Sequence, residues 1–238
     1  MSPEETKSKA LARIERIATG STTAETVLKI FKAALATTPF AGGIASLISD
    51  YIPSSRQRRI EEFAEQVAGD LKRLEQRVNE EYLRTDDFAF MFEKCFRGAA
   101  EHPQQEKLKA FRGILVNSAV KSDMPEQEKE YYLNLVNTLS VVHIRILRFL
   151  AAPDRYLEDI GISPQQLQGG FSQMFRTAMP DVGLEVIKSA FGDLHQGGLI
   201  NTDKSIFATM TSAQGLQLLG NRVSDLGRRF IEFCMVPR

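Results

Sequence analysis

The chain has 238 residues, of which 43% are hydrophobic and 25% charged, and its 30 lysines and arginines balance 30 aspartates and glutamates. These are the proportions of a soluble globular protein, so they exclude collagen-like, intrinsically disordered and disulfide-rich classes. A net charge of zero also excludes a chain-wide attraction to nucleic acid or anionic membranes, which leaves only local patches for such partners. The length suits one large domain or two of roughly 100 to 150 residues each.

The apolar segment 27–49 is the first distinctive element. A capping box at Thr22–Glu25 begins an apolar helix there, and residues 33–49 contain no charged side chain. Because Pro39 and the pair Gly42–Gly43 interrupt the stretch, we do not predict a permanent membrane span. Two interpretations stay open: a helical hairpin buried in the core, which we expect, and a segment that inserts into a membrane only after a trigger.

A long amphipathic helix is predicted from residue 56 to residue 84. Its apolar residues recur at spacings of three or four and form one stripe: Ile60, Phe63, Val67, Leu71, Leu74, Val78 and Tyr82. We expect this stripe to pack inside a helical bundle, and oligomerisation through the same helix is the alternative. Further helices are predicted at 86–101, 103–121 and 125–139, so residues 1–139 form a helical bundle domain.

Arg56, Arg58 and Arg59 form the tightest basic cluster of the chain. Arginines at the start of a helix oppose its dipole, so they need either nearby glutamates or an external anion. A solvated, salt-bridged helix start and a binding site for an anion or an acidic partner therefore both stay open. The motif Ile-Pro-x-x-Arg-x-x-Arg at residues 52–59, with the small-residue-rich apolar segment before it, loosely resembles bacterial abortive-infection or phage-defence proteins. That resemblance implies no catalytic residues.

Arg97 and His102 supply the one enzymatic hypothesis. Their Arg-x4-His spacing resembles that of helical HEPN-type ribonucleases, in which the histidine is a general base and the arginine stabilises phosphate charge. The residue after the arginine is Gly98, where that family usually has a polar side chain. We expect both residues to be exposed at a helix end, and expect no enzymatic activity.

The two cysteines, Cys95 and Cys234, lie far apart and form no Cys-x-x-Cys motif. This pattern predicts reduced thiols in a cytoplasmic protein, and neither a metal site nor a cofactor. The mixed-charge N-terminal residues lead into no hydrophobic signal region, so we expect the cytoplasm rather than secretion.

From residue 140 the pattern changes to shorter elements. We predict a helix over 142–150 that ends at Pro153, and a helix of about sixteen residues after a capping box at Ser163–Gln166. A helix over 184–196 then breaks at Gly197–Gly198, and β-forming residues at 206–210 predict a short strand. Helices after Thr211 and around Leu226–Phe233 complete the chain.

The order of these elements, with Gly198-Leu199-Ile200 after the third helix, resembles a bacterial winged helix-turn-helix domain over residues 140–238. The resemblance implies that helix 184–196 is a recognition helix and that a β-hairpin wing follows it. Lys188, His195 and Lys204 are the residues that would contact DNA. However, residues 140–238 contain only ten lysines and arginines against nine aspartates and glutamates, which is little charge for phosphate binding.

We therefore predict a mostly α protein with a helical bundle domain, 1–139, and a winged-helix-like domain with a small β-hairpin, 140–238. The function we expect is that of a non-enzymatic interaction or regulatory protein that docks a protein partner through helical and winged-helix surfaces, in bacterial defence. The alternatives are a DNA-binding transcriptional regulator, a membrane-active effector that uses residues 27–49, and a HEPN-like ribonuclease.

Overall fold

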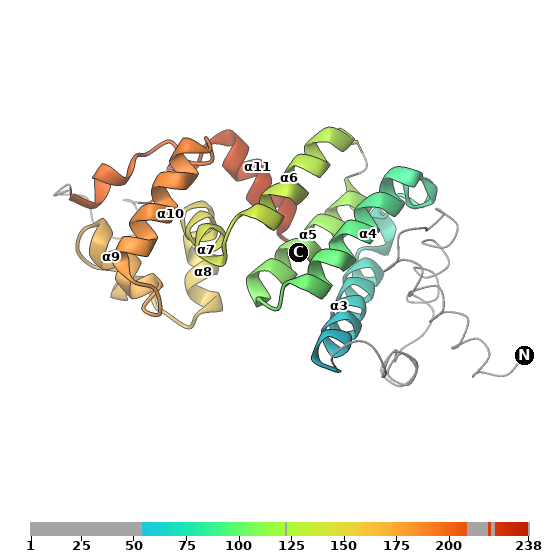
Figure 1. Ribbon diagram of the computed structural model, residues 1–238, viewed down its shortest axis with the longest axis horizontal. Helices are drawn as coiled ribbons and strands as arrows, with labels where there is room; N and C mark the ends of the chain where they lie inside the picture. The colour runs from blue at the N-terminus through green and yellow to red at the C-terminus, as the bar shows by residue number, and fades with distance from the viewer. Residues whose placement is uncertain (1–53, 122, 209–218, 220–221, 238) are drawn as a thin grey trace, which may run out of the picture. The chain divides into compact units, whose positions relative to one another are not determined.

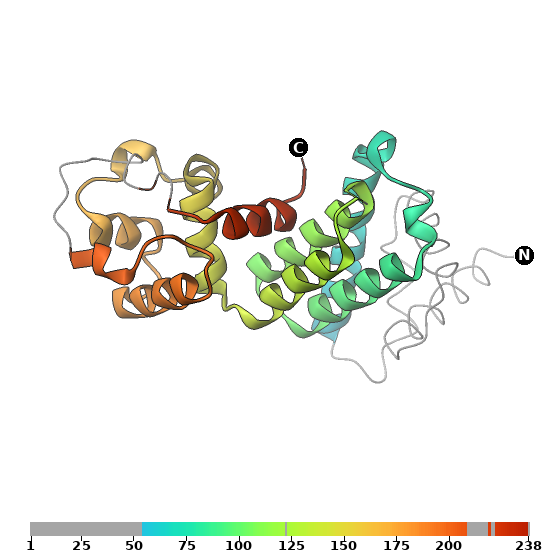
Figure 2. The ribbon, with the colours of Figure 1, turned by 90° about the horizontal axis from the view of Figure 1, so that it is seen from above.

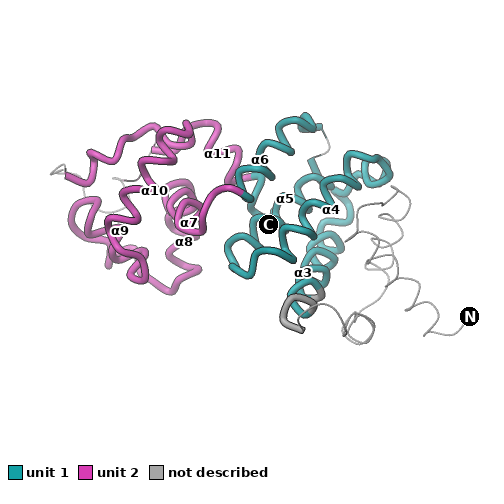
Figure 3. The backbone as a smooth tube through the Cα atoms, viewed as in Figure 1, with its two compact units in different colours: residues 1–137, 233–238 teal, residues 138–232 magenta. Residues whose placement is uncertain are grey.

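The computed structural model describes residues 54–121, 123–208, 219 and 222–237. They are mostly helical, as predicted (Figure 1). The chain divides into two compact units: unit 1 comprises residues 1–137 and 233–238, and unit 2 comprises residues 138–232 (Figure 3). The division falls two residues before the predicted boundary, and the end of the chain returns to unit 1. The apolar segment 27–49 lies outside the described residues.

The described part of unit 1 is built on four α-helices: α3 (Ser54–Arg73), α4 (Asp86–Glu101), α5 (Gln105–Val120) and α6 (Glu126–Thr138). The first three pack against one another around large apolar residues such as Phe88, Phe111 and Ile114. The helices predicted at 86–101, 103–121 and 125–139 are confirmed. Local signals delimit them, since the Thr85 hydroxyl accepts a hydrogen bond from the Phe88 backbone N–H, 3.2 Å away, and caps α4.

The single helix predicted over 56–84 is wrong beyond residue 73. α3 ends at Arg73, and two 3-10 turns follow, η2 (Glu75–Arg77) and η3 (Tyr82–Arg84). Asn79 keeps the chain from resuming as an α-helix, because its side-chain oxygen accepts hydrogen bonds from the backbone N–H groups of Glu81 and Tyr82 at 3.0 and 3.1 Å and starts η3. Such bonds compete with helical ones. The apolar stripe of α3 is used within unit 1, where Phe63, Val67 and Leu71 are buried.

Unit 2 surrounds an aromatic core. Its elements are α7 (Val141–Ala151), α8 (Pro153–Asp159), η4 (Pro164–Gln166), α9 (Phe171–Ala178), α10 (Leu184–Gln196), η5 (Lys204–Ala208) and most of α11 (Asp225–Cys234). Phe175 lies at the centre of the core, with ring centroids 5.2 Å from Phe149, 5.3 Å from Phe207 and 6.0 Å from Phe191. The α10 and α11 predictions are confirmed.

The predicted helix of sixteen residues after Ser163 is wrong in its extent. The capping box does form, since the Gln166 side chain accepts the Ser163 backbone N–H at 3.0 Å, but it caps only the 3-10 turn η4. Gly169 then adopts a φ of 82°, a left-handed conformation that ends any helix, and α9 begins two residues later.

The strand predicted over 206–210 is also wrong in its described part, because residues 204–208 form the 3-10 helix η5. The Asp203 carboxylate accepts the Ser205 N–H at 2.8 Å and starts this turn, while the Ser172 hydroxyl donates to the Phe207 carbonyl at 2.9 Å. The Ser172 bond ties η5 to α9, and η5 also packs beside α10 (Figure 2). In the part of the chain that the structure describes, β pairing is limited to one antiparallel bridge, Ile200 with Val223. Residues 209–218 lie outside that part.

Candidate functional site

One face of α10 is exposed on unit 2. The helix buries Ile187, Ala190, Phe191 and Leu194 toward the aromatic core. The opposite side carries the residues that we call the α10 face: Glu185, Val186, Ser189, Asp193 and Gln196, all of them exposed. With 3.6 residues per turn, these positions fall within one stripe. Val186 is the most exposed of the large apolar residues described, at 54%. The α10 face therefore combines an apolar side chain with two carboxylates.

Two basic side chains next to the α10 face contact its carboxylates. The Lys188 ammonium lies 2.9 Å from Glu185 Oε1, one turn away on the same helix. His143 on α7 contacts Asp193, with Nε2 3.3 Å from Oδ2. Because the Ser140 backbone N–H donates to His143 Nδ1 at 3.2 Å, Nδ1 accepts, and the proton of the neutral ring sits on Nε2, which donates to Asp193. The face thus presents carboxylates rather than free cations.

The three residues predicted to contact DNA are not arranged as a cationic group. Lys188 pairs with Glu185, and His195 is exposed in the last turn of α10. Lys204 begins η5, and its aliphatic stem runs beside Gly192 of α10, 3.4 Å from where a Cβ would be at that glycine. Asp203 lies near both: hydrogen bonds from Ser205 chiefly, with the charge of His195 adding, lower the pKa of its carboxyl. Acidic groups therefore accompany each candidate cation.

The predicted arginine cluster has one member committed elsewhere. The Arg59 guanidinium donates to the carbonyls of Ala99 and Ala100, at 3.0 and 2.7 Å, and so satisfies the last turn of α4. Arg58 is exposed, and the side chain of Arg56 lies outside the described residues. Arg59 thus acts as a helix cap. A local sequence pattern could not predict this role, because Arg59 and the carbonyls it caps are 40 and 41 positions apart in the sequence.

Arg97 and His102 have separate partners. Arg97 is exposed and pairs with Glu93 one turn earlier on α4. His102 is the C-cap of α4, and its ring stacks on Phe111 with centroids 5.8 Å apart. Partial burial, chiefly, lowers the pKa of His102. A ribonuclease pair of this type would direct both side chains at one phosphate, whereas here each side chain contacts a different residue.

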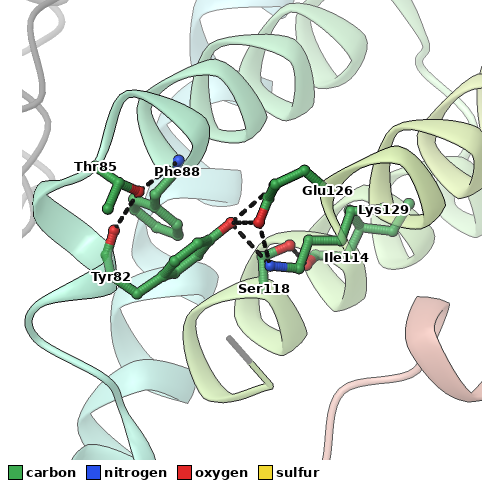
Figure 4. Close-up of polar contacts among 7 residues, drawn as sticks. All are labelled: Tyr82, Thr85, Phe88, Ile114, Ser118, Glu126 and Lys129. Carbon is green, nitrogen blue, oxygen red and sulfur yellow. Dashed lines mark hydrogen bonds and ion pairs between the residues drawn. The ribbon is translucent and has the colours of Figure 1, made fainter. Parts of the chain in front are cut away.

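A buried polar cluster in unit 1 was not predicted from the sequence. The Lys129 side chain is fully buried, and its ammonium donates to Glu126 Oε1 at 2.7 Å and to Tyr82 Oη at 3.0 Å (Figure 4). The Tyr82 hydroxyl in turn donates to Glu126 at 3.0 Å. Burial and the Glu126 carboxylate raise the pKa of Tyr82 well above its usual value, so the phenol stays protonated. The three groups satisfy one another and fasten η3 to α6.

Metal-binding clusters and membrane-crossing helices are both absent from the described residues. No three His, Cys, Asp or Glu side chains gather there to hold a metal ion. None of the helices described there is both long and apolar enough to cross a bilayer.

No known protein-family model matches the sequence, and no curated protein or solved structure matches it significantly.

Proposed function

We propose that this chain is a non-enzymatic interaction protein that docks a protein partner through the α10 face of unit 2. One observation carries the proposal: the face exposes Val186 beside Glu185 and Asp193, while Lys188 is paired with Glu185. Exposed apolar side chains flanked by charge are typical of contacts with another protein. Nucleic-acid recognition instead needs unpaired lysines and arginines for the phosphates and several amide donors for the base edges, and Gln196 is the one amide on this face.

We further propose that unit 2 is a winged-helix-like module. Its helix order supports this, as does the short antiparallel pairing that follows α10. The Asn201 N–H donates to the Arg222 carbonyl at 2.8 Å, and the Ser224 N–H donates to the Leu199 carbonyl at 3.1 Å. These bonds on either side of the Ile200–Val223 bridge pair residues 199–201 with residues 222–224, as the base of a wing would require.

The partner that suits the α10 face presents an apolar side chain to Val186 and a lysine or arginine to Glu185 and Asp193. Such a partner would gain charge-assisted hydrogen bonds at the rim of a small apolar contact. Bacterial defence is the biological role that we propose for this docking, on the basis of the sequence resemblance described above. The membrane-active alternative rests on residues 27–49, outside the described part of the chain.

A titration with labelled duplex DNA separates the proposal from the transcription-regulator alternative. At physiological salt we expect only weak, sequence-independent binding, which Lys188→Ala and Lys204→Ala leave unchanged, because these lysines lie among carboxylates. Tight, sequence-selective binding that either substitution abolishes would replace the proposal with the regulator. The salt dependence of any residual binding reports how many phosphates the protein contacts.

A further inference from the structure

The segment 233–237 lies in a cradle on unit 1. Asn117 of α5 is fully buried, and its amide nitrogen donates two hydrogen bonds of 2.8 Å, one to the Phe233 carbonyl and one to the Met235 carbonyl. From α3, the Arg73 guanidinium donates to the Pro237 carbonyl at 2.8 Å. The three bound carbonyls belong to alternate residues. Side chains of unit 1 therefore bind the backbone of this segment.

Gly113 lets the segment approach α5 closely. A Cβ at this position would lie 1.9 Å from the carbonyl oxygen of Cys234 and 2.3 Å from its carbonyl carbon. Backbone atoms of a helix and of a second segment meet here, and no rearrangement of a flexible side chain could relieve the contact. The cradle, which we define as Arg73, Gly113 and Asn117, thus requires glycine at its centre.

One aromatic residue anchors the segment. Phe233 is fully buried, and its ring centroid lies 5.6 Å from that of Tyr132. Cys234 is also buried, whereas residues 235–237 are half-buried and are held mainly through their carbonyls. Phe233 lies in the last turn of α11, and residues 235–237 follow it outside any helix. An aromatic anchor followed by a non-helical backbone with bound carbonyls is a mode of peptide recognition that depends little on the side chains after the anchor.

We infer that the cradle is a peptide-binding site, selective for an aromatic anchor followed by a segment whose backbone carbonyls are free to accept hydrogen bonds, and that residues 233–237 are its displaceable resident. The same sequence supplied from outside can make the same hydrogen bonds, because Arg73 and Asn117 bind this segment through its backbone carbonyls. A resident segment raises the apparent Kd for an added peptide in inverse proportion to the fraction of time that the site is empty. The site lies on unit 1 and is independent of the α10 face.

The test uses the full chain and a fluorescent peptide of residues 229–238, with fluorescence anisotropy as the readout. Phe233→Ala weakens the resident segment but leaves the cradle intact, so we expect it to bind the peptide at least about tenfold more tightly than the wild-type chain. Adding Gly113→Ala to that variant should abolish binding, because the new methyl group occupies the position of the peptide backbone. A peptide whose anchoring phenylalanine is replaced by alanine is the matched ligand control.

Circular dichroism first establishes that each variant folds. Should Phe233→Ala unfold the chain, Phe233→Leu keeps most of the buried area and supports the same comparison with a smaller gain in affinity. A folded variant that binds the peptide no more tightly than wild type would overturn the inference, as would undiminished binding after Gly113→Ala. In the wild-type chain, an excess of isotope-labelled peptide should speed hydrogen exchange at the backbone amides of Met235 and Val236, and unchanged exchange would contradict displacement.

Discussion

Units 1 and 2 differ in where their polar side chains lie. The buried polar and charged residues among those that the structure describes are Lys107, Asn117, Ser118 and Lys129, and all four belong to unit 1. Unit 2 instead fills its interior with aromatic rings and places its ion pairs, such as Arg145 with Asp181, toward the surface. Unit 1 thus contains directional contacts in its interior, where unit 2 has apolar packing.

The difference shows how each unit specifies its structure. A buried donor must find its acceptor, so Lys129 fixes η3 on α6 and Asn117 fixes the segment 233–237 on α5. Aromatic packing is strong but less directional, and it can hold the irregular elements η4 and η5 of unit 2 around one core. Substitutions in unit 1 should therefore act through lost or blocked contacts, and those in unit 2 through lost volume.

The largest expected effect is in the aromatic core of unit 2. Phe175→Ala removes a fully buried ring that contacts Phe149, Phe191 and Phe207, and we expect it to lower the free energy of unfolding by about 3–5 kcal/mol. Urea denaturation measures the loss, and hydrogen exchange should localise it to residues 138–232. Val186→Ala, on the exposed α10 face, is the control and should change stability by less than about 0.5 kcal/mol. A similar loss for both variants would contradict the assigned core.

The next effect tests the cradle of unit 1. Gly113→Ala forces the backbone of Cys234 away from α5, and we expect a loss of about 2–3 kcal/mol from overpacking. Gly69→Ala in α3 is the matched control, since nothing lies within 4 Å of its Cβ position. It should stabilise the protein by up to about 1 kcal/mol through helix propensity. Equal effects of the two substitutions in thermal or urea unfolding would show that the segment does not pack on Gly113.

A carboxylate-to-amide comparison sharpens the contrast in polar groups. Glu126→Gln removes the counter-charge of the buried Lys129, and we expect a loss of about 1–2 kcal/mol, moderated because Glu126 itself is partly exposed. Lys129→Met in the same background should recover part of that loss, since it removes the uncompensated charge. No loss on Glu126→Gln would mean that the Tyr82 hydroxyl alone satisfies Lys129.

The smallest effect concerns a surface ion pair of unit 2. Arg145 binds both carboxylate oxygens of Asp181, at 2.6 and 2.8 Å, and lowers the pKa of that carboxyl. Because the folded-state pKa is depressed, the stabilisation is present above the unfolded pKa and disappears as the pH falls through the folded pKa. Asp181→Asn should therefore lose less than about 1 kcal/mol near neutral pH, since Asp181 is largely exposed. The difference from wild type should shrink as the pH falls through the folded-state pKa of Asp181; a difference that stays constant over that range would have a non-electrostatic origin.

Local signals explain which elements could be predicted. Thr85, Pro103 and Pro125 delimit α4, α5 and α6, and the apolar spacing of residues 184–194 defines α10. The apolar spacing of three and four also continues through residues 74–82. Hydrogen bonds to the Asn79 side chain favour a 3-10 turn in this stretch, and the apolar spacing of a sequence does not reveal such bonds. Phe207 similarly lies in a run of residue types that are typical of strands, but it belongs to the 3-10 helix η5, and its ring packs in the aromatic core.

The candidate site was predictable where its contacts are local. Helical position places Glu185, Val186 and Asp193 on one stripe, and the spacing of Glu185 and Lys188 indicates their pairing. The contact of His143 with Asp193 joins residues 50 positions apart and needs the fold. Lys129 was missed because it lies in a run of charges, which predicts a solvated helix. Asn117, a polar residue on the apolar side of α5, was a signal that sequence reasoning could have used.

Site-specific photo-crosslinking tests most directly whether the α10 face binds a protein. A photoreactive amino acid replaces Val186 in one variant and Ile160, which is also exposed on unit 2, in a control. After irradiation in nuclease-treated native lysate, we expect a discrete protein adduct at position 186 that is absent at position 160 and is lost when Glu185 and Asp193 are replaced by lysine. An identical pattern at both positions, or an adduct at 186 that forms only when the nuclease treatment is omitted, would contradict the proposed docking role of the α10 face.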